Sequence, residues 1–176
     1  MIPTVQVSDT VLVDELSYRL HSPRFGDLAV FVPPVPPFGT PFIKRVIGVP
    51  GDTIRIQEGV LYRNGVTVSE PYVNEPPNYD LAVEHDTIVV DGRPLSPSDA
   101  DIPPPRMWQS PNRIPAGFYL MLGDNRNYSD DSHLWGFAQL HGEFVAGPLA
   151  KRHVQAAFLG RAVMVLWPPS QIGMLR

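Results

Sequence analysis

The chain has no cysteine among its 176 residues, which excludes disulfide bonds, thiol catalysis and metal sites built on cysteine. Its five histidines are scattered and form no HExxH pair, so we expect no metal site, and we expect no cofactor. The net charge is −4 and no basic run is present, which argues against a nucleic-acid partner. No apolar run is long enough to span a bilayer.

Proline and glycine are abundant, with 21 and 14 residues, and they favour short strands and turns over long helices. Hydrophobic residues make up 43 % and charged residues 18 %, a balance typical of a globular domain. We therefore predict a mainly β protein, a twisted antiparallel sheet core with an inserted smaller β subdomain. Within this single domain, the core is expected at about residues 1–65 and 118–176. The inserted β cap, rich in proline and acidic residues, is expected at about 66–117.

Several segments carry the pattern of individual strands. Core strands are expected at residues 10–16, 26–32, 42–49, 117–124 and 160–167. Hairpins are expected at residues 53–68, where Asn64-Gly65 favours a tight turn, and at 85–95. The single helix candidate covers residues 150–158.

One basic residue stands out because the chain otherwise uses arginine. Only Lys44 and Lys151 are lysines among the fourteen basic residues. On a strand, Lys44 shares a face with Phe42 and Val46, two apolar side chains. Lys44 is either a surface residue that keeps its ammonium in water or a desolvated general base. In the second case burial lowers its pKa from about 10.4. Arginine could not serve as a base, because it stays protonated.

A second polar cluster, "GDNRNYSDDSHLWGF", occupies residues 123–137. It is either a polar surface loop, in which Asn127-Tyr128-Ser129 is a chance glycosylation sequon, or a functional loop between strands. Its composition alone leaves both interpretations open.

Together these stretches resemble bacterial type I signal peptidases, which are membrane-anchored serine endopeptidases with a Ser/Lys pair. "MIPTVQVSDTVLV" resembles the segment that follows the nucleophilic serine. "GDLAVF", "FIKRVIGVPGD" and "GDNRNYSDDSHLWGF" resemble three later family boxes, in the correct order. "GRAVMVLWPPSQIG" resembles the C-terminal segment of the branch found in cyanobacteria and plastids. The resemblance covers most of the chain.

The sequence departs from the family at the nucleophile. In the family, the serine immediately precedes the methionine that Met1 matches, and no residue here takes its place. Also absent are a second serine two residues before the nucleophile and the upstream membrane anchor. We therefore expect that the chain starts just after its nucleophile and is inactive as given. The full protein would be membrane-anchored, with its catalytic domain on the exoplasmic side, in the periplasm or thylakoid lumen.

The resemblance assigns roles to residues that match the family boxes. Lys44 matches the general base, and Ser129 matches a serine that orients the lysine amine without adding charge. Two charged pairs are expected to support the loop, Asp131 with His133, which replaces the family's arginine, and Asp124 with Arg45. The alternative for all four is ordinary surface ion pairing, which contributes little.

The substrates implied are signal peptides of secreted preproteins, cut after a small-x-small motif and bound alongside an exposed strand. Positions that match the lining or flank of shallow pockets are Met1, Val5, Val30, Phe42 and Ile43. Core packing is the alternative, strongest for Val5 and Val30. Trp167 matches a region that contacts the membrane surface, although a packed core tryptophan fits equally well.

Two other classes of protein remain as alternatives. One is a catalytically silent β module that binds peptides or partner proteins. The other is a self-cleaving repressor of the SOS type, which shares the Ser/Lys chemistry. We rank the repressor last, because such proteins lack the "GDNR…DS" box and this chain lacks a helix-turn-helix.

Overall fold

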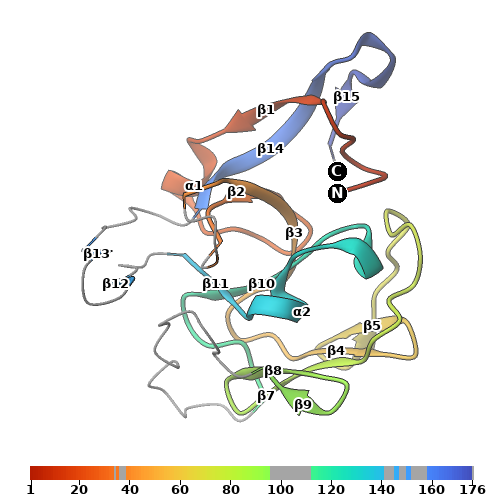
Figure 1. Cartoon of the computed structure of the whole chain (residues 1–176), viewed down its shortest axis with the longest axis vertical. Coiled ribbons are helices and arrows are strands. Elements are labelled where there is room, and N and C mark those ends of the chain that lie inside the picture. Colours follow the sequence, from red (N-terminus) through yellow and green to blue (C-terminus); the bar gives the residue numbers. More distant parts are fainter. Residues whose placement is uncertain are drawn as a thin grey trace.

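The computed structural model describes residues 1–33, 35, 39–95, 112–140, 145–146, 150–151 and 158–175. Antiparallel strands dominate this part of the chain and form a larger and a smaller sheet, plus a short pair of strands (Figure 1). The helices there are single turns: α1 (Ser17–Leu20), α2 (Ser132–Trp135) and the 3₁₀ turns η1 (Arg126–Tyr128) and η2 (Pro169–Gln171). The predicted mainly β class is confirmed.

The larger sheet has the strand order β1-β14-β2-β3-β10-β11, and β15 also pairs with β14. Its strands are β1 (Thr10–Asp14), β2 (Leu28–Phe31), β3 (Phe42–Gly48), β10 (Phe118–Leu122), β11 (Ala138–Gln139), β14 (Phe158–Trp167) and β15 (Gly173–Met174). The first strand of the chain pairs with the long strand near its end, so the two termini lie close together (Figure 1). Each of the five core strands expected from the sequence is present.

The smaller sheet has the order β6-β5-β4-β7-β8-β9. Its strands are β4 (Ile54–Gln57), β5 (Val60–Arg63), β6 (Val66–Thr67), β7 (Leu81–Glu84), β8 (Thr87–Val90) and β9 (Arg93–Pro94). Both predicted hairpins are confirmed. Asn64-Gly65 turns between β5 and β6 with φ values of 53° and 78°, which is why this dipeptide suits the turn. The sheet begins before residue 66, and the boundaries of the inserted cap stay a prediction.

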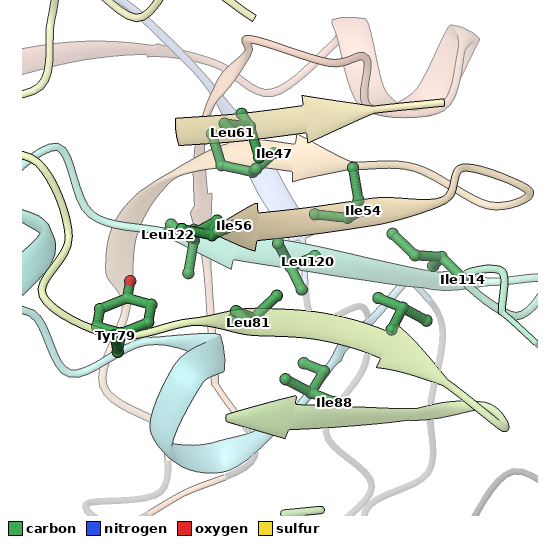
Figure 2. Close-up of a cluster of buried hydrophobic side chains, with 11 residues drawn as sticks. Ile47, Ile54, Ile56, Leu61, Tyr79, Leu81, Ile88, Ile114, Leu120 and Leu122 are labelled. Carbon is green, nitrogen blue, oxygen red and sulfur yellow. The ribbon is translucent and has the colours of Figure 1, made fainter. Parts of the chain in front are cut away.

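An apolar cluster joins the two sheets. It contains Ile47, Leu120 and Leu122 from the larger sheet, Ile54, Ile56, Leu61, Leu81, Val83 and Ile88 from the smaller sheet, and Tyr79 and Ile114. Figure 2 shows most of these side chains pointing toward one another from strands of both sheets. A second cluster, which includes Val46 and Met121, lies on the other face of β3 and β10. The central strand β3 is therefore buried on both faces, and this determines the surroundings of Lys44.

The predicted helix at residues 150–158 falls mostly on 152–157, which lie outside the described residues. Its first two residues form β13 (Ala150–Lys151), which pairs with β12 (Val145–Ala146), and its last begins β14. Across the described ranges, no helix is both long and apolar enough to cross a membrane.

Candidate active site

Lys44 lies on β3, where its cross-strand neighbour on β2 is Ala29. The residue is only 9 % exposed, so the amine does not extend into open water. Its Nζ donates a hydrogen bond to Ser129 Oγ at 2.8 Å and lies 5.5 Å from the centre of the Phe42 ring. Burial lowers the pKa of the Lys44 amine, and the opposing charges of Asp131 and Asp130 do not cancel this effect. The arrangement is that of a largely desolvated lysine held by an uncharged partner.

The position of Ser129 beside Lys44 depends on Gly123, which packs against the serine side chain. Ser129 follows η1 directly, and its side chain lies against Gly123, the residue after β10. A Cβ atom on residue 123 would lie 2.2 Å from Ser129 Oγ, closer than any real contact. Glycine at this position therefore leaves the space that the serine hydroxyl occupies beside the amine.

Arg45 points to the opposite face of β3 and forms a buried ion pair with Asp124. Its Nε and Nη2 donate to the two carboxylate oxygens at 2.8 and 2.7 Å, and the side chains are 1 % and 0 % exposed. Its Nη1 donates to the carbonyl of Gly26 at 3.0 Å. This bidentate, fully buried geometry is unlike a surface ion pair.

Asp131 connects the end of β10 to α2. Its Oδ2 accepts the Gly123 backbone N–H at 2.8 Å, and its Oδ1 accepts the backbone N–H of His133 at 3.1 Å. The Nδ1 of His133 lies 2.7 Å from the same Oδ1. The His133 ring stacks on Tyr79, with centroids 4.5 Å apart and planes 7° from parallel. Both oxygens of Asp131 are thus occupied away from the Lys44 amine.

The first residues of the chain lie beside the same cluster. The Thr4 hydroxyl donates to Asp124, and the Val5 backbone N–H donates to the Met1 carbonyl at 3.1 Å. Burial lowers the pKa of the Met1 amine, and the charge of Lys44 lowers it further. The N-terminal segment therefore approaches the Lys44 amine closely enough for the two charges to interact.

The other expected residues fall into three groups. Val30, Phe42 and Ile43 are half-buried. Val30 pairs with Ile43 across β2 and β3, one position from Lys44, whereas Phe42 shares the face of β3 that carries Lys44. Met1 is also half-buried, whereas Val5 is part of the buried core. Trp167 is 58 % exposed at the end of β14, which rules out a packed core tryptophan.

A family model described as "Signal peptidase, peptidase S26" matches residues 1–167. The chain belongs to the signal peptidase family.

Relatives of this chain occur in cyanobacteria and in chloroplasts, the branch expected from the C-terminal segment. It is 34 % identical to "Probable signal peptidase I-2" of Synechocystis sp., over 99 % of this chain and 62 % of the relative. It is 33 % identical to "Signal peptidase I" of Leptolyngbya laminosa, over 99 % of this chain and 68 % of the relative. It is 29 % identical to "Thylakoidal processing peptidase 1, chloroplastic" of Arabidopsis thaliana, over 98 % of this chain and 41 % of the relative. The chain thus spans about two thirds or less of the length of these relatives.

The sequence analysis did not predict one buried charged pair, between Arg126 and Glu70. The Arg126 side chain is 0 % exposed, and its guanidinium donates to both oxygens of Glu70. Burial would by itself lower the pKa of Arg126, but its hydrogen bonds and charge interaction with Glu70 raise it above the usual value. No pattern in the sequence links two residues 56 positions apart. The one available signal was the arginine inside the "GDNR" box itself.

Proposed function

We propose that this chain is the catalytic domain of a membrane-associated serine endopeptidase that removes signal peptides from secreted preproteins. The observation that carries the proposal is the Lys44 amine, buried and hydrogen-bonded to the hydroxyl of Ser129, with the N-terminal segment beside it. Burial lowers the pKa of this amine and so favours the neutral form, which a general base requires. We further propose that the nucleophile is a serine directly before Met1 in the full-length protein.

The proposed reaction forms an acyl-enzyme on that serine. Lys44 takes the proton of the serine hydroxyl while the oxygen attacks the scissile carbonyl. The lysine then gives the proton to the leaving amine as the peptide bond breaks. A water molecule next loses a proton to Lys44 and attacks the ester. Lys44 returns this proton to the serine oxygen as the ester bond breaks, which releases the carboxylic acid and restores the serine hydroxyl.

The uncharged partner of the amine is important for this role. One N–H of Lys44 donates to Ser129 Oγ, which leaves the lone pair of a neutral amine aimed elsewhere. A carboxylate in the same place would stabilise the ammonium and raise the pKa. Asp131 is near enough to influence the amine electrostatically, but its oxygens accept hydrogen bonds from Gly123 and His133 instead.

For the substrate, we propose an extended signal peptide that lies beside residues 42–44 of β3, which pair with β2 but extend beyond the register with β10. The half-buried side chains of Val30, Phe42, Ile43 and Met1 would contribute to shallow apolar pockets. Pockets of this kind admit small side chains and exclude large ones, which fits a small-x-small motif. The domain would act on the exoplasmic side of a membrane, held there by an upstream anchor.

The exposed apolar side chains near the ends of β14 and β15 support contact with the membrane surface. They include Trp167, Leu166, Ile172 and Met174, which are 58 %, 42 %, 54 % and 66 % exposed. Tryptophan favours the interface between lipid and water.

Trp167→Ala should weaken the sedimentation of this chain with anionic lipid vesicles, whereas Val66→Ala on the smaller sheet should not. Equal binding by both variants would contradict a membrane contact at Trp167.

The proposed activity can be tested on the full-length protein purified in detergent. It should cleave a preprotein after its small-x-small motif, and alanine in place of the serine before Met1 should abolish cleavage, because no acyl-enzyme can form. Mass spectrometry of the products locates the cut. A full-length protein that binds signal peptides but leaves them intact would instead support the catalytically silent β module.

A further inference from the structure

The connection between β6 and β7 lies along the loop that carries Ser129. We call residues 70–79, "EPYVNEPPNY", the strap, and residues 123–133 the site loop. In Figure 1 the yellow-green strap leads into β7 beside the teal turn that follows β10. The two segments are about 50 residues apart in sequence, yet hydrogen bonds, an ion pair and ring stacking connect them.

The strongest of these contacts is the ion pair between Glu70 and Arg126. Nη1 and Nη2 of Arg126 donate to the two oxygens of Glu70 at 3.1 and 2.6 Å. The remaining Nε donates to the Gly123 carbonyl at 3.0 Å, and Tyr72 donates its hydroxyl to Glu70 at 2.8 Å. Without Glu70, a fully buried guanidinium would have no counter-charge at this position, so the turn that carries it would have to move toward water.

Four more contacts join the strap to the site loop, and a fifth joins it to Arg45 on β3. The Asn74 N–H donates to the Asp124 carbonyl at 3.2 Å, and the Tyr72 ring lies 3.7 Å from the Arg45 guanidinium, the partner of Asp124. Asn127 accepts the Asn78 N–H at 2.8 Å and donates its amide to the Pro76 carbonyl at 3.1 Å. Tyr79 stacks on His133. The strap therefore holds the site loop on both sides of Ser129.

We propose that the strap positions Ser129 against the Lys44 amine, with Glu70 as the main positioning residue. Ser129 directly follows η1, and Arg126, the first residue of η1, is the one that Glu70 holds. A shift of this turn would move Ser129 away from the amine and admit water to Lys44. The inference rests on the proposed function, because it concerns the orientation of the general base.

Glu70→Ala and Asn127→Ala test the strap at two separate contacts. The readout is the NMR titration of lysine side chains, which is simple because the chain contains two lysines. We expect the pKa of Lys44 to rise toward the ordinary lysine value in each variant. In the full-length enzyme, kcat should fall by about 100-fold with KM nearly unchanged, the effect of misplacing a catalytic group.

A control variant separates positioning from stability. Asp52→Ala removes a carboxylate that binds Arg63 at 2.7 Å and Asn64 at 2.8 Å, away from the site. This variant should unfold at lower urea concentration while the pKa of Lys44 and kcat stay at their wild-type values. Asn127 is half-buried and uncharged, so Asn127→Ala still provides the test if Glu70→Ala does not fold.

The outcomes are distinguishable. Folded variants whose Lys44 titrates as in the wild type would overturn the role of the strap and leave the proposed function intact. A wild-type Lys44 that titrates like an exposed lysine would instead contradict the proposed function. A rise in the Lys44 pKa in Asp52→Ala as well would show that general destabilisation, rather than the strap, controls the site.

Discussion

Replacing Lys44 with arginine is expected to abolish preprotein cleavage by the full-length enzyme. Arginine keeps the length and the charge but does not lose its proton at working pH, so it cannot take one from the nucleophile. General bases contribute roughly 10²- to 10⁴-fold to rate, and kcat should fall by at least that much. In the wild type, activity should rise with pH through the lowered pKa of Lys44, because only the neutral amine is a base.

Lys151→Arg is the matched control, since it changes the one other lysine of the chain. Its kcat/KM for the same preprotein should equal that of the wild type. Cleavage at the wild-type rate by Lys44→Arg would show that another group activates the nucleophile.

The second large effect is expected in stability. Asp124→Asn removes the charge that faces Arg45 in a pair that is almost fully buried. Breaking such a pair from one side costs about 3–5 kcal/mol, because the remaining charge stays buried and loses its carboxylate counter-charge. Urea unfolding of this chain measures the loss directly, as the change in the free energy of unfolding.

Arg161→Gln provides the comparison for a longer and only partly buried pair, in which the Asp27 side chain is 10 % exposed. Arg161 lies 3.6 Å from Asp27 and its side chain is 43 % exposed, so its loss should cost no more than about 1 kcal/mol. If Asp124→Asn were as mild as Arg161→Gln, the buried pair would not contribute to the fold as the geometry indicates.

Local sequence patterns predicted much of the fold because each of them acts over a few residues. The hairpin expected at residues 53–68 begins with β4, in which Ile54 and Ile56 are buried and Arg55 and Gln57 are exposed, the two-residue alternation of a half-buried strand. The same two-residue period placed Lys44 on one face with Val46, which is buried in the second cluster. The Asn64-Gly65 turn fixed a hairpin through its own backbone preference.

Contacts between distant residues could not be predicted in this way. Arg126 is a charged residue in a polar loop, a type that is usually exposed, and its counter-charge in the buried site comes from the distant Glu70. The stacking of Tyr79 on His133 likewise depends on how the two sheets pack together. The role of the proline-rich strap was hidden for the same reason, since its partners lie in the site loop.

The resemblance to signal peptidases identified Lys44 and Ser129 as a pair, and the structure places their polar atoms 2.8 Å apart. Spacing alone could not have done so, because 85 residues separate them. Their catalytic roles stay a prediction that rests on the protonation state of one amine.

That state can be measured directly by titrating the Lys44 side chain in this chain with NMR, with Lys44→Arg to assign its signal. The account predicts a pKa below the ordinary lysine value, because burial disfavours the ammonium. A Lys44 amine that loses its proton at about pH 10.4, as a lysine in water does, would contradict it.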